Sequence, residues 1–305
     1  KIIAYNAEFH KVSKSPYGSD DEIGMLNLID GESRSKIIGN TDASKVFDLS
    51  VDNFIGMPGW FGAGDQPYQI WMTHTPQGEI VANLMGVKKE QNELVAYSGD
   101  AISMYTHCGT HIDTFNHFGY NGEIFNGFTA KDHLGSRAWD VCGPENYPPI
   151  FARGILLDIA AMHGVDTLEP SHPIGKKDIE DCLKKQDLKI EPGDVVLLRT
   201  GQMLRWPDMA FTQNTPGLNR EGAEYIAKHG AIMIGADNLT LEMTPSQHPV
   251  HTYLLAEAGV PILEMAWLEE LAAEKVYEFA FFGACIKLRG ATGTPMRPVA
   301  MPLRR

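Results

Sequence analysis

Five short runs of apolar and β-branched residues most constrain how this chain can fold. Each run is almost continuously hydrophobic, as expected for strands that are covered on both faces by helices. Helix-like segments at 176–186 and 219–230 separate three of these runs, and Gly230 marks a natural helix end. This alternation predicts an α/β protein. The five predicted strands span residues 45–51, 154–160, 194–201, 231–237 and 277–288.

Length and charge narrow the class of protein further. The 305 residues contain no internal repeat, low-complexity segment or linker, so we expect a single domain over 1–305. No run approaches the roughly 20 apolar residues of a membrane span. The net charge is −13 and the basic residues are scattered, which disfavours a nucleic-acid surface. We therefore expect a small-molecule substrate and neither a membrane nor a nucleic acid as partner.

The cysteines and the first ten residues indicate the cellular compartment of the protein. Four cysteines lie far apart without a CxxC pair, which favours a reduced protein. The first ten residues, KIIAYNAEFH, lack the charged start and long apolar run of a signal peptide. Together these features predict a cytoplasmic protein.

Residues 107–117, HCGTHIDTFNH, hold three of the 11 histidines. Glycine and threonines lower the helical propensity of this segment, so an extended or looped path is expected. In an extended segment His111 and Asp113 point to the same side, and Gly109 allows a bend that brings His107 to the same point. Each histidine alone is more often an ordinary hydrogen-bonded residue, but their joint occurrence has no packing rationale. Imidazole and carboxylate ligands suit Zn²⁺ or another divalent ion, with positions left for water and substrate.

An aromatic stretch at 56–78 is too apolar for a loop that is exposed throughout. Such a segment packs on the core, forms a wall of the substrate pocket or reaches a neighbouring subunit, and the sequence leaves these options open. Another aromatic residue lies inside the histidine motif. The candidate substrate-binding residues are Trp60, Phe61, Trp71 and Phe115.

The motif H-x-G-T-H-x-D-x-x-x-H resembles that of the cyclase-like metal-dependent hydrolases, which include kynurenine formamidases, isatin hydrolases and cyclic imide hydrolases. Family members often carry Pro two residues after the aspartate, where this chain has Phe115. The resemblance covers nearly the whole chain and implies a central mixed β-sheet flanked by helices, the swivelling β/β/α fold. Further similar segments are 20–30, 235–242, 251–264 and 290–300.

The resemblance also implies residue roles. His117 is expected to carry the proton in catalysis, while His251 and Glu264 complete the site. The family binds one or two ions, here Zn²⁺ or Mn²⁺, and its members are commonly dimers or tetramers. The sequence leaves open whether His248 also reaches the site. The implied metal ligands are His107, His111 and Asp113.

These roles predict a metal-dependent amidohydrolase. A divalent ion lowers the pKa of bound water from about 15.7 toward about 7, so metal-bound hydroxide can attack a carbonyl. His117, with a reference pKa of about 6.5, can act in turn as base and acid. An aromatic pocket favours a flat ring, so we expect hydrolysis of the C–N bond of a cyclic amide or imide. The alternatives are an aryl formamidase of the N-formylkynurenine type, a lactone hydrolase, and a non-catalytic binding protein.

Overall fold

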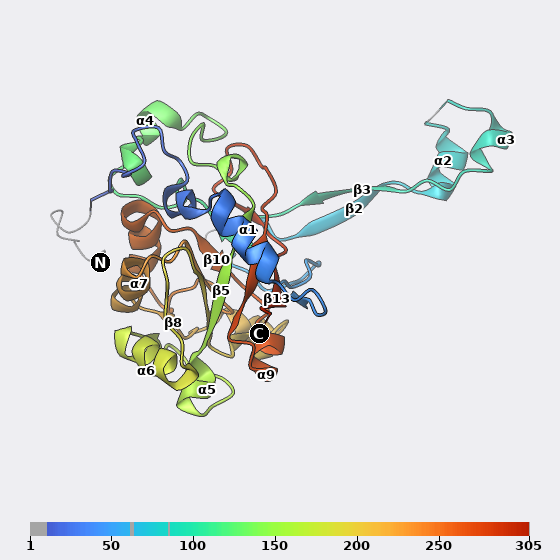
Figure 1. Ribbon diagram of the computed structural model, residues 1–305. Helices are drawn as coiled ribbons and strands as arrows, with labels where there is room; N and C mark the ends of the chain where they lie inside the picture. The colour runs from blue at the N-terminus through green and yellow to red at the C-terminus, as the bar shows by residue number, and fades with distance from the viewer. Residues whose placement is uncertain (1–10, 62–63, 85, 305) are drawn as a thin grey trace.

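The computed structural model describes residues 11–61, 64–84 and 86–304. Figure 1 shows a body built around one large sheet and a long arm that projects away from it. The prediction about a signal peptide concerns residues 1–10, which lie outside the described residues. Within the described parts of the chain, none of the helices combines the length and apolar character needed to cross a bilayer.

The body contains a mixed sheet in the strand order β1-β13-β11-β5-β7-β9-β10-β4-β12. The four strands β5, β7, β9 and β10 are parallel, and antiparallel pairs extend the sheet on both sides. This architecture confirms the expected α/β fold with a central mixed sheet. The strands are β1 (Phe47–Asp48), β4 (His111–Asp113), β5 (Ile150–Asp158), β7 (Val195–Arg199), β9 (Met233–Ala236), β10 (Ile262–Glu264), β11 (Glu278–Gly283), β12 (Gly293–Pro295) and β13 (Val299–Pro302).

All five predicted strands lie in this sheet. Every residue of β7 is buried, as its continuous hydrophobicity indicated. The strand predicted over 154–160 ends earlier, because the carboxylate of Asp158 accepts a hydrogen bond from the amide of Ala161 at 3.0 Å and starts a helix there.

The helices flank the sheet (Figure 1). The helix predicted at 176–186 is α6, which begins where Asp178 accepts a hydrogen bond from the Gly175 amide at 3.0 Å. Helix α1 packs against β5 and β11, α6 against β5, and α5 against β7. The helices are α1 (Gly31–Asn40), α2 (Pro76–Ala82), α3 (Lys89–Asn92), α4 (Ala130–His133), α5 (Ile159–His163), α6 (Lys176–Gln186), α7 (Arg220–Lys228), α8 (Pro249–His251) and α9 (Glu269–Ala273).

Shorter elements complete the body. Strands β6 (Pro173–Ile174) and β8 (Gly217–Leu218) form a small parallel pair. A π-helix, η6 (Thr252–Ala258), directly follows α8. The 3₁₀ helices are η1 (Gly24–Leu28), η2 (Phe125–Gly127), η3 (Pro144–Asn146), η4 (Gln202–Arg205) and η5 (Met209–Thr212).

The arm is a two-stranded antiparallel ribbon of β2 (Gln69–His74) and β3 (Gly99–Ser103). Helices α2 and α3 lie at its far end (Figure 1). The aromatic stretch at 56–78, interpreted as a loop from its glycines and prolines, is therefore a strand over part of its length. Pro76 begins α2, a position where its missing N–H costs no helical hydrogen bond.

Candidate metal centre

The register of β4 builds the first part of the centre. Strand β10 pairs with β4 so that Glu264 lies opposite His111, and the His111 Nε2 atom lies 3.2 Å from Glu264 Oε2. Ile112, between the two motif residues, points to the other face and is fully buried in the core. The predicted extended path of the motif is confirmed, and the pairing of β4 with β10 explains how Glu264 reaches it.

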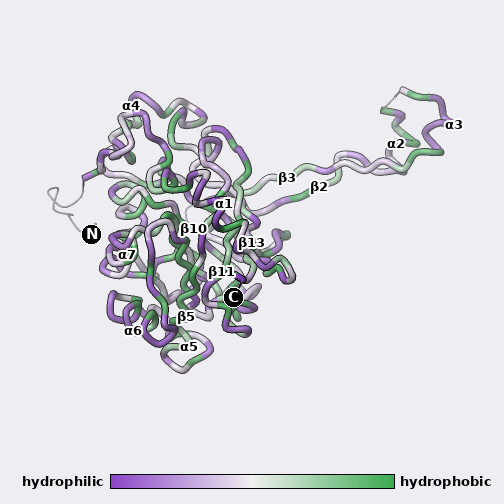
Figure 2. The backbone as a smooth tube through the Cα atoms, in the orientation of Figure 1, coloured by the Kyte–Doolittle hydropathy of each residue, from purple (hydrophilic) through white to green (hydrophobic). Residues whose placement is uncertain are grey.

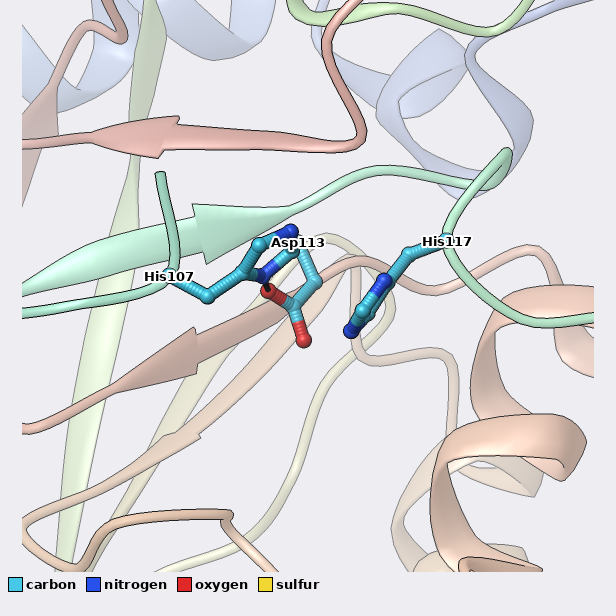
Figure 3. A group of neighbouring side chains, drawn as sticks. All are labelled: His107, Asp113 and His117. Atoms are coloured by element: carbon cyan, nitrogen blue, oxygen red, sulfur yellow. Dashed lines mark hydrogen bonds and ion pairs between the residues drawn. The ribbon is translucent and has the colours of Figure 1, made fainter. Parts of the chain in front are cut away.

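His107 joins from the loop before β4. Its Nδ1 atom lies 2.6 Å from Asp113 Oδ1, and Figure 3 shows the Asp113 carboxylate pointing into the space between the rings of His107 and His117. Gly293 makes room for this ring, because a Cβ there would lie 2.5 Å from His107 Cε1. Gly109 has a φ of +64°, which allows the bend that the sequence indicated.

His251 approaches from the junction of α8 with the π-helix. Its Nε2 atom lies 3.1 Å from Glu264 Oε1 and 3.7 Å from Asp113 Oδ2. π-Helical turns occur frequently at functional sites. The structure therefore brings His251 and Glu264 to the motif.

Two motif histidines have one ring nitrogen engaged on the side away from the cluster. The Nδ1 atom of His111 donates to the Gly109 carbonyl at 2.8 Å. The Nε2 atom of His107 lies 2.9 Å from Thr292 Oγ1, so this nitrogen can donate to the hydroxyl. Such outer partners fix the tautomer of a metal-binding histidine and leave the other nitrogen free as a ligand.

Glu242 is the outer hydrogen-bond partner of His251. Its side chain is 1% exposed, and its Oε1 atom accepts a hydrogen bond from His251 Nδ1 at 2.5 Å. The Oε2 atom accepts hydrogen bonds from Ser246 Oγ at 3.0 Å and from the Val250 amide at 3.1 Å. Because the carboxylate is held from both sides, the Nε2 atom of His251 is directed at the cluster.

These residues fit a divalent cation. The His111 Nε2 and Asp113 Oδ2 atoms are buried and make no hydrogen bond, and a buried polar atom left without a partner costs about 1–3 kcal/mol. Among the described residues, two groups of candidate ligand atoms that lie within 4.8 Å of one another contain Asp113, one with His111 and Glu264 and one with His107 and His117. Asp113 belongs to both groups, so these residues would hold either one ion or two.

The ionisable side chains of the cluster shift one another's pKa values. Burial opposes a charge on His111, but the carboxylates of Asp113 and Glu264 outweigh it and raise the pKa of this imidazole to about 10. Burial also opposes a charge on His251, while Glu242 raises its pKa well above the usual value. Without a cation, protonated imidazoles therefore balance the buried carboxylates.

His117 differs from the other three histidines. Its ring stacks on His107 with centroids 3.9 Å apart and an angle of 25° between the planes. In the described part of the chain, no protein group forms a hydrogen bond with this ring. Burial lowers the pKa of His117 well below its usual value, so the ring is neutral at pH 7. Its position allows either metal binding or proton transfer, and its role as proton carrier stays a prediction.

A cavity of about 100 Å³ opens onto the cluster. Trp60, Tyr105 and Phe118 line it together with His248. Trp60 lies at the wall of this cavity, and its part in substrate binding stays a prediction. His248 also reaches the cavity, with its Nδ1 atom 3.2 Å from Glu242 Oε1. The cavity combines flat apolar walls with the polar cluster.

Three of the four predicted wall residues do not line this cavity. Phe115 is fully buried and packs against Phe125 and Tyr147 in the core, so its assignment to the wall is corrected. The chain turns after β4 ends, and this turn sends the ring inward. Trp71 lies on the arm and is 50% exposed, while Phe61 is partly buried.

Sequence reasoning missed Glu242, Thr292, Tyr105 and Phe118. The segments that contain Glu242 and Thr292, 235–242 and 290–300, resemble the family. The available signal for Glu242 was an acidic residue at the end of the segment NLTLE, in which polar and apolar residues alternate. Nothing local marks Thr292, whose contact with His107 depends on the pairing of β12 with β4.

A second histidine group lies on the surface. His163 Nε2 is 2.9 Å from Asp178 Oδ1, and His172 Nε2 is 3.9 Å from the same atom. The side chains of all three residues are between 21% and 34% exposed. Asp178 also begins α6, so a helix cap and a surface ion pair explain this group.

Comparison with named proteins shows weak but extensive similarity. The kynurenine formamidase of Bacillus thuringiensis subsp. konkukian (strain 97-27) is 24% identical over 206 residues, which cover 66% of this chain and 79% of the relative. A kynurenine formamidase of Bacillus cereus matches with the same identity and coverage.

Solved structures share the fold. A crystal structure described as that of a novel cyclase superposes with a TM-score of 0.84 and 28% identity, covering 95% of this chain and 99% of that chain. Isatin hydrolase A from Ralstonia solanacearum superposes with a TM-score of 0.61 and 21% identity, covering 85% of this chain and 92% of that chain. This second likeness bears on the fold alone.

The family model named Cyclase matches residues 47–243. The match contains the whole motif at 107–117 and ends before His251 and Glu264. It spans more than half of the chain, and the structural similarity extends over nearly all of it. The chain belongs to the Cyclase family.

Proposed function

We propose that the protein is a metal-dependent amidohydrolase that opens the C–N bond of a cyclic amide or imide and releases a carboxylate. One observation carries this proposal. Three histidines each have one nitrogen engaged by an outer partner and the other directed at the carboxylates of Asp113 and Glu264, beside a small aromatic cavity. The histidines are His107, His111 and His251.

A bound divalent cation, Zn²⁺ or Mn²⁺, would polarise the substrate carbonyl and lower the pKa of a water molecule. His107, His111, Asp113 and Glu264 would hold it, with His251 added where a second ion binds. His117 is neutral at pH 7 and therefore accepts the proton of the attacking water. It then donates that proton to the departing nitrogen, which balances the reaction.

The cavity supports a compact substrate. Its volume of about 100 Å³ is small beside the roughly 300–1,000 Å³ of common ligand sites. Trp60, Tyr105 and Phe118 present aromatic surfaces that suit a flat ring. A single-ring lactam or imide fits this space better than a substrate with a long side chain.

An aryl formamidase is the second candidate, because the named relatives are kynurenine formamidases. A lactone hydrolase would use the same cluster, since esters are also open to attack by activated water. These alternatives differ in the bond that is cleaved and in the shape of the substrate.

A substrate screen separates the candidates. The metal-loaded protein is presented with isatin, succinimide, phthalimide, dihydrouracil, N-formylkynurenine and a simple lactone, and loss of the ring or formyl absorbance is followed. We expect turnover of at least one cyclic amide or imide. Turnover of N-formylkynurenine alone, or of the lactone alone, would replace the proposal by the corresponding alternative. No turnover of any compound would favour a binding protein.

A further inference from the structure

The ring of His248 forms part of the wall of the small cavity beside the cluster. Its centroid lies 6.2 Å from that of Trp60 and 5.3 Å from that of Phe118, and both of these aromatic rings line the same cavity. The proposed reaction assigns metal binding and proton transfer to other side chains. His248 is therefore a polar group at the cavity that this reaction does not yet use.

Glu242 determines which ring nitrogen of His248 carries the hydrogen. The Nδ1 atom of His248 lies 3.2 Å from Glu242 Oε1, and a carboxylate only accepts hydrogen bonds, so Nδ1 is the donor. In a neutral imidazole the other nitrogen is then an acceptor. The Nε2 atom makes no hydrogen bond with another described residue, and solvent reaches it. The ring therefore presents an unused hydrogen-bond acceptor at the cavity.

Hydrogen bonds also account for a third group of neighbouring ligand atoms, that of Glu242, His248 and His251. The Nδ1 atoms of both histidines lie at hydrogen-bond distance from the same oxygen, Glu242 Oε1. Both nitrogens therefore point at the carboxylate and need no ion between them.

The backbone holds the ring of His248 in place. Its amide donates to Ser246 Oγ at 2.9 Å, and its carbonyl accepts from Thr252 Oγ1 at the same distance. His248 has a φ of +60°, in the left-handed region that side chains rarely adopt. Residues held in this region concentrate at functional sites. A ring that is fixed before a ligand arrives can bind it with less loss of entropy.

The other polar groups at the cavity have partners or a proposed task. His117 is assigned to proton transfer, and the Tyr105 hydroxyl has a hydrogen to donate, which suits a substrate carbonyl. The remaining ones make hydrogen bonds with other side chains or with the backbone: His107, Thr240, His251 and Glu264.

We infer that His248 Nε2 accepts a hydrogen bond from the N–H group of the ring substrate, so that the site selects lactams and imides over rings without N–H, such as lactones. This inference rests on the proposed function for the class of substrate. The N–H bond of a cyclic amide lies in the plane of its ring, whereas the departing nitrogen is protonated from outside that plane. His248 can thus orient the nitrogen while His117 protonates it.

A comparison of two five-membered rings on the purified, metal-loaded full chain tests this inference. 2-Pyrrolidinone carries the N–H, and γ-butyrolactone has oxygen in its place. Ligand-detected NMR gives the dissociation constant of each ring, and the same spectra give kcat/KM if a ring is opened. We expect the wild type to favour the lactam. His248→Asn should reduce this preference by about tenfold, roughly the contribution of one hydrogen bond.

The variants separate hydrogen bonding from folding. Asn tolerates a positive φ but is too short to place an acceptor at the position of Nε2, whereas the longer amide of His248→Gln should recover part of the preference. His229→Asn, a change of an exposed histidine that contacts the Tyr225 carbonyl, should retain the wild-type ratio. Metal content and the circular dichroism spectrum of His248→Asn should match those of the wild type.

An unchanged ratio in His248→Asn, or a wild type without preference for the lactam, would overturn the inference. Loss of the metal in His248→Asn would also overturn it, because His248 would then be a ligand. The ratio of dissociation constants is measured even where neither ring is opened, so failure of the proposed enzymatic activity is distinguishable from failure of this inference.

Discussion

The candidate metal-binding side chains and the arm differ in which groups lack their usual surroundings. At the cluster, polar atoms such as His111 Nε2 and Asp113 Oδ2 are buried without hydrogen-bond partners. Along the arm, apolar side chains such as Trp71 and Ile102 are exposed to solvent. Folding of a single chain normally avoids both situations. The cluster therefore indicates a cation as its missing partner, whereas the arm leaves apolar side chains in contact with solvent (Figure 2).

This comparison implies that the two regions respond to different changes. Removing a side chain of the cluster should abolish metal binding and leave the arm unchanged, because the arm shares no residue with the cluster. Removing apolar groups from the arm should leave metal binding unchanged. The following predictions test that separation, beginning with the largest effect.

His111→Ala removes a buried residue that we propose as a metal ligand. We expect loss of the metal and a fall of activity to the level of the metal-free protein, because His111 lies against both Asp113 and Glu264. Elemental analysis and turnover measure the two effects. His163→Ala, a change of a surface histidine paired with Asp178, is the control and should retain metal and activity. Metal retained at the wild-type level in His111→Ala would contradict the ligand assignment.

His117→Ala should lower kcat by about 10²–10⁴-fold with the metal retained, since general acid–base catalysis contributes about that much. Steady-state kinetics and metal content provide the readout. Loss of the metal in this variant would instead identify His117 as a ligand, which its stacking on His107 also permits.

Glu242→Gln should weaken metal binding or activity by roughly 10–100-fold, the usual range for a partner of a metal-binding histidine. The amide can still accept the hydrogen bond from His251, but it supplies no negative charge. Metal titration measures the affinity. Ser246→Ala removes only one neutral donor to Glu242 and should have a much smaller effect. Equal effects of the two changes would show that general packing, and not the carboxylate charge, matters there.

Metal binding should release protons. His111 has a folded-state pKa of about 10, above the unfolded value of about 6.5. In the metal-free protein, the stabilisation from its proton is therefore fully present below about pH 6.5 and is lost as the pH rises toward about 10. A first cation displaces this proton, so affinity should rise with pH. Calorimetry at about pH 7.5 in buffers of different ionisation enthalpy should give about one proton released for the first ion bound. Release of no protons would contradict this charge balance.

The sequence predicted the parts of the centre that are local. His107, His111 and Asp113 lie within seven residues, so alternation along an extended segment and a bend at Gly109 were sufficient to group them. The buried strands were also predictable, because hydrophobicity on both faces has a clear signature in runs such as 194–201. The resemblance to the family added the mixed sheet, which the structure confirms.

The remaining features depend on contacts that no local pattern contains. Glu264 reaches His111 through the register of β10 with β4, and Glu242 reaches His251 through a turn and the start of α8. Phe115 was assigned to the pocket because it lies in the motif, but the turn after β4 places it in the core. For the aromatic stretch at 56–78 the sequence left open packing on the core, a pocket wall or contact with a subunit, and only the structure revealed that part of it is a projecting ribbon.

The central claim is that the buried cluster holds a catalytic cation while His117 moves the proton. The most direct test is quantitative elemental analysis of the wild type and His117→Ala, with turnover measured on the same samples. We predict about one to two divalent ions per chain in both proteins and a large loss of turnover in the variant alone. Metal-free wild type with undiminished turnover, or wild-type turnover in His117→Ala, would contradict the account.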